Sequence, residues 1–174
     1  MSTQRVAVPY DHQLGKTLAL LRNPGLLLAA TGASGRSNAM TIGWGSVGII
    51  WGLPVFIALV RPSRFTYGLI EETGEFTVNV PAPEMRRFVG LCGTKSGRDI
   101  DKFAEGGIST QAGQQVRAVT IDGCPLVYEC RSVHYNDLIP ENLLESIEKS
   151  SYGGSDYHRL YFGQILGTYA SPDY

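Results

Sequence analysis

The sequence has no long apolar run, no excess of one charge and few cysteines, and each absence excludes a class of protein. Its 15 basic residues nearly balance 16 acidic residues, which gives a formal net charge of -1. Nucleic-acid-binding domains usually carry a basic face, so we expect no nucleic-acid partner. The apolar stretch 25–31 is far shorter than the roughly 20 residues of a membrane-spanning helix, so we expect no membrane segment.

The three cysteines are too few and too widely spaced for a disulfide framework. Cys92, Cys124 and Cys130 have no histidine at a metal-ligand spacing, so we expect no metal site and interpret all three as buried apolar side chains. The N-terminus lacks the charged head and apolar stretch of a secretion signal. Together with free thiols, this composition predicts a cytoplasmic location.

Glycine is abundant, and its 21 residues lie between short apolar segments, which predicts many tight turns joining short strands. Strands dominate without regular strand–helix alternation, so residues 1–174 are expected to form a single mainly β domain, a barrel or sandwich with inserted helices. Helices are expected at 84–91, at 141–150 with an apolar stripe of Leu143, Leu144 and Ile147, and after Ser63, a suitable N-cap, up to Gly74. Strands are expected at 26–31, 37–45, 53–60, 75–80, 158–168, and as a pair 116–121 and 126–135 around the turn 122–125.

Residues 43–48, Gly-Trp-Gly-Ser-Val-Gly, match the G-x-G-x-x-G pattern of dinucleotide-binding proteins. That pattern has this function only where a helix starts inside it and an acidic residue follows about 20 positions later. Residues 49–54, Ile-Ile-Trp-Gly-Leu-Pro, cannot begin a stable helix, and no acidic residue lies between Gly45 and Glu71. We therefore exclude a Rossmann site.

Three short segments concentrate amides, hydroxyls and positive charge in a chain whose total charge is near zero. The first contains Arg61, Ser63, Arg64 and Thr66 at an expected helix start, where guanidinium groups, hydroxyls and backbone amides can bind a phosphate. Two arginines at the positive end of a helix repel each other unless an anion lies between them. The alternative is a pair of solvated surface arginines on a helix capped by Ser63.

The other two segments suit the remainder of a small-molecule pocket. Asn38 and Thr41 could hydrogen-bond a heterocycle while Trp44 covers an aromatic plane; the alternative is an ordinary half-buried strand. The sequence Ser-Gly-Arg-Asp at 96–99 predicts a tight turn into a helix that contains Lys102. The alternative for that segment is an ordinary salt-bridged helix start.

Four segments occur in the order and at the approximate spacing of one known family. Through them the chain resembles the flavin reductase-like family, which has an FMN-binding split barrel and includes the flavoredoxins. The resemblance covers about 20–103 well and the remainder weakly. The four segments are Asn38-Ala-Met-Thr-Ile-Gly-Trp44, Val60-Arg-Pro-Ser-Arg-Phe-Thr-Tyr67, Gly74-Glu-Phe-Thr-Val-Asn-Val-Pro81 and Ser96-Gly-Arg-Asp-Ile-Asp-Lys-Phe103.

The resemblance implies a homodimeric Greek-key split β-barrel with inserted helices and one FMN per subunit near the dimer interface. By position in the family motifs, Asn38, Met40 and Thr41 would line the isoalloxazine and ribityl chain, with Trp44 beside the ring. The phosphate end would be formed by Arg61, Ser63, Arg64 and Tyr67, with Asn79 nearby. Ser96, Arg98 and Lys102 would belong to the segment that closes over the cofactor, and His158 would contact the ring edge.

The family also implies an FMN-binding oxidoreductase of the flavin reductase type, which takes electrons from NADH or NADPH and passes them through the flavin to an acceptor. The cofactor carries this chemistry, so no side chain is expected to be an indispensable acid or base. One alternative is a flavoredoxin-type electron carrier, reduced by a redox protein partner and without a nicotinamide site. Another is a module that binds FMN, or another phosphorylated molecule, without turnover.

Two departures from the family pattern concern the substrate side of the expected pocket. Gln164 follows Gly163 at a position where the family commonly has an acid. The polar insertion 140–157 is expected either to replace the family's C-terminal segment or to form a lid.

Overall fold

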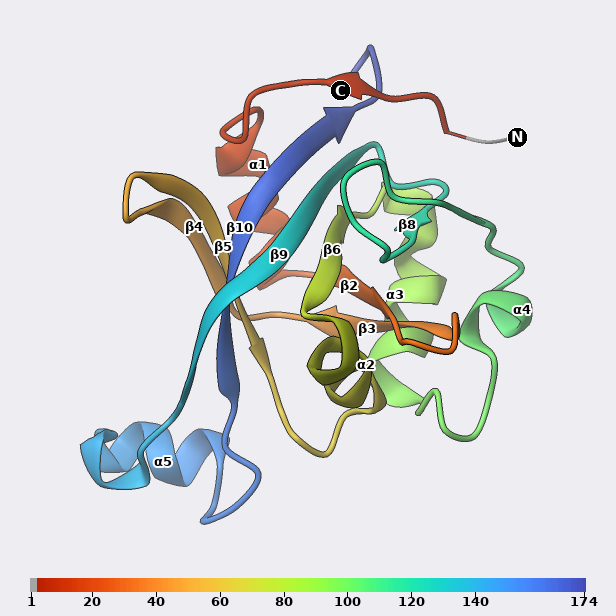
Figure 1. Ribbon diagram of the computed structural model, residues 1–174. Helices are drawn as coiled ribbons and strands as arrows, with labels where there is room; N and C mark the ends of the chain where they lie inside the picture. Colours follow the sequence, from red (N-terminus) through yellow and green to blue (C-terminus); the bar gives the residue numbers. More distant parts are fainter. Residues whose placement is uncertain (1–2) are drawn as a thin grey trace.

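Two long strands, β9 (Leu126–Asp137) and β10 (Arg159–Ala170), cross the whole of the computed structural model, which describes residues 3–174 (Figure 1). They pair with each other, and the sheet continues on both sides in the order β3-β2-β6-β9-β10-β5-β4, with β1 added to β10. All of these pairings are antiparallel. The other strands are β1 (Val6–Ala7), β2 (Leu26–Thr31), β3 (Ser37–Ile42), β4 (Gly45–Ile50), β5 (Leu53–Val60), β6 (Glu75–Val80), β7 (Thr110–Gln111) and β8 (Thr120–Ile121).

Short helices are inserted between the strands, as the sequence predicts. In Figure 1, α3 and α4 cover one side of the barrel, while α5 lies far from them at the distant ends of β9 and β10. None of the helices in residues 3–174 has the length and apolarity that a membrane crossing requires. The helices are α1 (Leu14–Arg22), α2 (Phe65–Thr73), α3 (Arg86–Thr94), α4 (Lys102–Gly106) and α5 (Glu145–Ser151), with single 3-10 turns at Pro83–Met85 and Pro140–Asn142.

Strand β2 separates two hydrophobic clusters, which explains why its sequence is a continuous apolar run. Successive side chains of a strand point to opposite faces of the sheet. Leu26 and Leu28 therefore face the barrel interior, while Leu27 and Ala29 face a second core that includes Phe88 of α3. All six residues of β2 are buried, which confirms the prediction of a strand buried on both faces.

The predicted pairing of 116–121 with 126–135 is wrong. Both edges of β9 are occupied, by β6 and by β10, so segment 116–121 has no free edge to join. Polar side chains of β6 hold its backbone instead: Thr77 Oγ1 donates to the Val119 carbonyl at 2.7 Å, and Asn79 Oδ1 accepts from the Ile121 amide at 2.9 Å. Only the short β8 remains as a strand, and it pairs with β7.

The predicted strand 37–45 is two strands. It breaks after Ile42, and β4 then turns back along β5 through a hairpin at Trp51 and Gly52, whose φ angles are 54° and 73°. Positive φ at both positions is the geometry of a type I′ hairpin, which is usually signalled by Asn-Gly. Since tryptophan is unusual at the first of these positions, the residues at 51 and 52 did not indicate a turn.

Two predictions about helix ends also differ from the structure. Ser63 does not cap α2, which begins one residue after Arg64 and has no side-chain cap, although Gly74 ends it with φ 68° as expected. Helix α5 begins four residues later than predicted, at Glu145. Its expected apolar stripe does not pack on the barrel, because Leu144 and Ile147 are 69% and 47% exposed.

Candidate functional site

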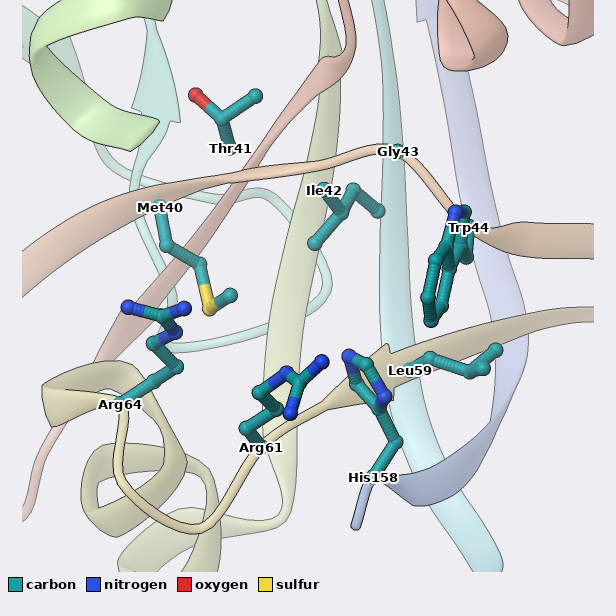
Figure 2. Close-up of a pocket in the computed structure, with 9 residues that line it drawn as sticks. All are labelled: Met40, Thr41, Ile42, Gly43, Trp44, Leu59, Arg61, Arg64 and His158. Carbon is teal, nitrogen blue, oxygen red and sulfur yellow. The ribbon is translucent and has the colours of Figure 1, made fainter. Parts of the chain in front are cut away.

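Two adjoining pockets lie between β3, the end of β5, the start of α2 and the segment 92–102. The aromatic pocket, of about 190 Å³, has Trp44 and His158 in its wall (Figure 2). The basic pocket, of about 320 Å³, is surrounded by Arg64, Arg98 and Lys102. Met40, Thr41 and Arg64 line both, so the two pockets are direct neighbours that share part of their walls.

Strand β3 places its side chains alternately toward and away from the aromatic pocket. In Figure 2, Met40 and Ile42 point toward Arg61 and Arg64, whereas Thr41 points to the other side of the strand. There its hydroxyl donates to the carbonyl of Val89 in α3 at 2.6 Å. The strand therefore presents an apolar surface to the pocket.

Aromatic rings close the opposite end of the aromatic pocket. The Trp44 and His158 rings are 5.1 Å apart between centroids, and Figure 2 shows them pointing toward each other. The Tyr152 hydroxyl is 2.8 Å from His158 Nδ1. Burial, and then the positive charge of Arg61, lower the pKa of His158 to about 4, so the imidazole is neutral at pH 7.

The basic pocket is lined by positively charged side chains. Arg64, Lys95, Arg98 and Lys102 line it, and no carboxylate from the described residues does. Lys102 is only 3% exposed, and its Nζ donates to the carbonyls of Ala39 and Cys92, at 2.8 and 3.1 Å. Burial lowers the pKa of this ammonium group, and carbonyl dipoles do not neutralise its charge. A partly enclosed site of this kind favours an anion.

Hydroxyl groups add further hydrogen-bonding capacity to the basic pocket. They come from the beginning of α2 and the residues before it, and from the end of α3 and the residues after it: Ser63, Thr66, Thr94 and Ser96.

Close contacts hold the 96–102 segment against β3 and α2. Asn38 Nδ2 donates to Thr66 Oγ1 at 2.8 Å, and Arg98 Nη1 donates to the Ser63 carbonyl at 2.9 Å. A side chain at Gly97 would place its Cβ 2.2 Å from Asn38 Oδ1, so this approach requires glycine. The glycine of the Ser-Gly-Arg sequence thus determines the shape of the pocket.

The structure brings together most of the predicted site residues, although they come from separate segments. Trp44, Arg61 and His158 line the aromatic pocket; Asn38, Ser63, Ser96, Arg98 and Lys102 line the basic pocket; and Met40, Thr41 and Arg64 line both.

Tyr67 and Asn79 line neither pocket. Tyr67 points to the other side of α2, where its ring lies 6.1 Å from the Tyr161 ring, because each helical residue rotates the side-chain direction by about 100°. Asn79 is fully buried in β6, where its Nδ2 donates to the Leu27 carbonyl and its Oδ1 binds the 119–121 segment. Its role in the structure is to hold strands together.

Arg61 also differs from its predicted place at a phosphate. Its guanidinium donates to two backbone carbonyls, those of Ser151 at 2.7 Å and Asp156 at 3.0 Å. It therefore anchors the polar insertion beside the aromatic pocket.

Sequence reasoning missed several lining residues. Thr94 and Lys95 directly precede Ser96 and could have been found by extending that segment. Leu59 was interpreted only as a strand residue. Asp156 lines neither pocket but accepts two hydrogen bonds from Ser63. The sequence contained no signal for this contact, because only the three-dimensional path of the insertion brings Asp156 near α2.

The interpretation of the three cysteines as buried side chains is confirmed. Cys92, Cys124 and Cys130 are buried free thiols. Among residues 3–174, no group of histidine, cysteine, aspartate and glutamate side chains is arranged to hold a metal ion.

The family model of the flavin reductase like domain matches residues 21–173. The chain belongs to this family. The match confirms the resemblance that the four sequence segments indicated, and it extends beyond them to the end of β10.

Individual relatives share less sequence than fold with this flavin reductase-like chain. An uncharacterised protein of Archaeoglobus fulgidus is 32% identical over 98 residues, which are 56% of this chain and 55% of the relative. The matched region thus spans about half the length of that relative. A flavoredoxin from Methanosarcina acetivorans is 27% identical, with a TM-score of 0.67 over 86% of this chain and 70% of that protein.

More distant structures show the fold alone. The flavoredoxin of Desulfovibrio vulgaris is 22% identical, with a TM-score of 0.69 over 86% of this chain and 70% of that protein. A split-barrel protein from Shewanella frigidimarina is 16% identical, with a TM-score of 0.67 over 92% of this chain and 75% of that protein. The flavin reductase-like chain therefore has the predicted mainly β split-barrel fold, with inserted helices.

Proposed function

We propose that this flavin reductase-like protein binds FMN across the two pockets and is an FMN-dependent oxidoreductase. The observation that carries this proposal is that an aromatic and a basic pocket adjoin and share Met40, Thr41 and Arg64. One end of the site offers apolar and aromatic contacts, and the other offers positive charge and hydroxyls. A ligand with a flat ring at one end and a dianionic phosphate at the other matches both ends.

The donor set fits the cofactor. The isoalloxazine would lie in the aromatic pocket against Met40 and Ile42, with Trp44 and His158 at its edge. The phosphate would lie in the basic pocket, where Arg64, Arg98 and Lys102 supply charge. When bound, FMN would supply two-electron chemistry, accepting hydride from NADH or NADPH and passing electrons to an acceptor. The side chains of this protein bind and orient the cofactor and exclude water from the ring.

Arg64 provides the first test, since it lines both pockets and is exposed to an incoming ligand. A guanidinium–phosphate contact contributes about 1.5–3 kcal/mol, so Arg64→Ala is expected to weaken FMN binding by about tenfold or more. The rate of the FMN-saturated enzyme should change little. Quenching of flavin fluorescence measures the affinity, and Arg22→Ala, on exposed α1, is the matched control. Equal FMN affinity in the wild type and Arg64→Ala would refute the assignment.

A flavoredoxin-type electron carrier is the second candidate, and the 27% identity to the flavoredoxin of Methanosarcina acetivorans favours it. Such a protein would receive electrons from a redox protein and would need no nicotinamide site. Stopped-flow mixing of the FMN-loaded protein with NADH or NADPH separates the candidates. Rapid bleaching of the flavin supports the reductase, and an unchanged oxidised spectrum supports the carrier.

We also propose that the protein is a homodimer in the cytoplasm. Large apolar side chains at the β4–β5 hairpin support dimerisation, because Trp51 and Ile49 are 62% and 56% exposed. The three free thiols support a reducing compartment. Sedimentation analysis at micromolar concentration tests the first point, and cell fractionation tests the second.

A further inference from the structure

The segment that joins α5 to β10, residues 151–157, lies against the site and is called the strap here. Arg61 anchors both of its ends through the carbonyls of Ser151 and Asp156. The guanidinium of Arg61 also lies 5.0 Å from the centre of the Tyr152 ring. The Tyr152 hydroxyl reaches His158 Nδ1. The strap thus contacts two residues that line the aromatic pocket, Arg61 and His158.

Asp156 makes the contact that matters for ligand binding. Its Oδ1 accepts from the Ser63 amide at 3.1 Å, and its Oδ2 accepts from the Ser63 hydroxyl at 2.6 Å. Ser63 lines the basic pocket, so the carboxylate occupies two donors of a residue in the wall of an anion site. The backbone of Asp156 has φ 54°, a left-handed conformation that side-chain-bearing residues seldom adopt. The strap therefore bends sharply at Asp156, the residue whose carboxylate contacts Ser63.

A carboxylate in this place resembles the ligand that the pocket is built to hold. Like a phosphate, it is an anion that accepts from one backbone amide and one hydroxyl at the beginning of a helix. The Asp156 carboxylate is also attracted to the positive charges of Arg61 and Arg64, and Arg64 lines both pockets. Two anions cannot share the donors of Ser63, because each donor has one hydrogen available.

We propose that Asp156 is an internal competitor of the phosphate group, which binds Ser63 in the free protein and must release it when FMN binds. This inference rests on the proposed function. While Asp156 occupies Ser63, the phosphate cannot use these two donors. The apparent affinity for FMN is therefore reduced in proportion to the fraction of molecules in which Ser63 is free. Binding of the phosphate releases the Asp156 side chain and so loosens the strap, which Arg61 then holds only through the Ser151 and Asp156 carbonyls.

The test replaces Asp156 by asparagine, which keeps the shape of the side chain and tolerates a left-handed backbone but removes the charge. Asp156→Asn is expected to bind FMN about three- to tenfold more tightly than the wild type, as measured by flavin fluorescence. Riboflavin, which lacks the phosphate, is expected to bind both proteins equally. Asp99→Asn, which removes the same charge from the exposed loop next to Arg98, controls for the general field and should change little.

Chymotrypsin gives a second readout, because the strap contains Tyr152 and Tyr157. FMN is expected to speed cleavage at these tyrosines in the wild type. Asp156→Asn should be cleaved at the faster rate even without FMN. Weaker FMN binding by Asp156→Asn, or protection of the strap by FMN, overturns the proposal and makes Asp156 a support of the site.

Inorganic phosphate separates this inference from the proposed function. If the wild type binds no FMN, the proposed function fails, and the strap is then followed with phosphate alone. Faster cleavage at millimolar phosphate in the wild type, with no effect in Asp156→Asn, supports the competition at Ser63. Cleavage that phosphate leaves unchanged in both proteins overturns it.

Discussion

At the scale of single residues, His158 is the titratable group of the site whose charge state the structure defines most clearly. It lies beside Trp44, accepts or donates a hydrogen bond with Tyr152, and faces the positive charge of Arg61. Protonation would place a second cation next to that guanidinium in a partly buried position. The neutral imidazole is therefore part of the aromatic wall over the physiological range.

This charge state predicts how the stability of the protein depends on pH. The folded pKa of His158 is about 4, below the ordinary value of 6.5, so the unfolded chain binds the proton more tightly. Stability should be unaffected above pH 6.5 and should fall as the pH drops toward 4. Allowing for partial exposure, we expect a loss of about 1 kcal/mol between pH 7 and pH 5.

Urea unfolding at the two pH values measures this loss. His158→Gln should abolish that part of the pH dependence, and the exposed His134→Gln should retain it. A wild-type profile in His158→Gln would show that other groups are responsible.

At the scale of elements, the position of Trp44 depends on the close approach of β4 to β5. A side chain at Gly45 would place its Cβ 2.8 Å from the Ile57 carbonyl oxygen and 3.1 Å from the Phe56 ring. Both neighbours belong to β5, and Phe56 is fully buried. Glycine at 45 is therefore required for the turn that carries Trp44 to the pocket.

Gly45→Ala is expected to destabilise the fold by about 2 kcal/mol, because β4 must move away from β5. It should also weaken FMN binding, since the movement displaces Trp44. Gly48→Ala is the matched control: the position lies in the same strand, and an added Cβ would meet no atom within 4 Å. Thermal unfolding and flavin fluorescence measure the two effects. Equal stability of the two variants would contradict the close approach seen here.

The elements also show what the sequence can and cannot predict. The ends of β2, β5 and β6 agree with the predictions, because each strand is an apolar or alternating run between glycine or proline residues. The predicted pairing of segment 116–121 was wrong because the hydrogen-bond partners of this segment are side chains of β6, which are distant in sequence. The family resemblance located eleven pocket residues, of which ten lie in the four segments and the other is His158. Tyr67 and Asn79 line neither pocket, because Tyr67 points to the other side of α2 and Asn79 is buried among the strands around β6.

At the scale of the whole molecule, the distribution of charge matters more than its sum. The formal net charge is -1, yet four cations and no described carboxylate line the basic pocket. Other acidic side chains pair away from this pocket, as Glu71 and Asp137 do with Arg159. An anion is therefore attracted to one place on a nearly neutral protein.

The salt dependence of binding follows from this distribution. Raising the ionic strength from 0.05 to 0.5 M shortens the screening length to below about 5 Å, so FMN affinity should fall several-fold. Riboflavin affinity should stay constant or rise slightly, because its binding has no phosphate contribution. Titrations at both salt concentrations test this, and equal slopes for the two ligands would contradict a phosphate in the basic pocket.

The buried cysteines have a practical consequence for experiments that attach a dye to the strap. Burial raises the pKa of Cys92 to about 11 and raises those of Cys124 and Cys130 as well, and thiols react with maleimides in their deprotonated form. The three native thiols are therefore not expected to react with maleimide labels. A single cysteine introduced at exposed Ser155 can carry a fluorescent dye without background, and the wild-type sequence becomes its own unlabelled reference.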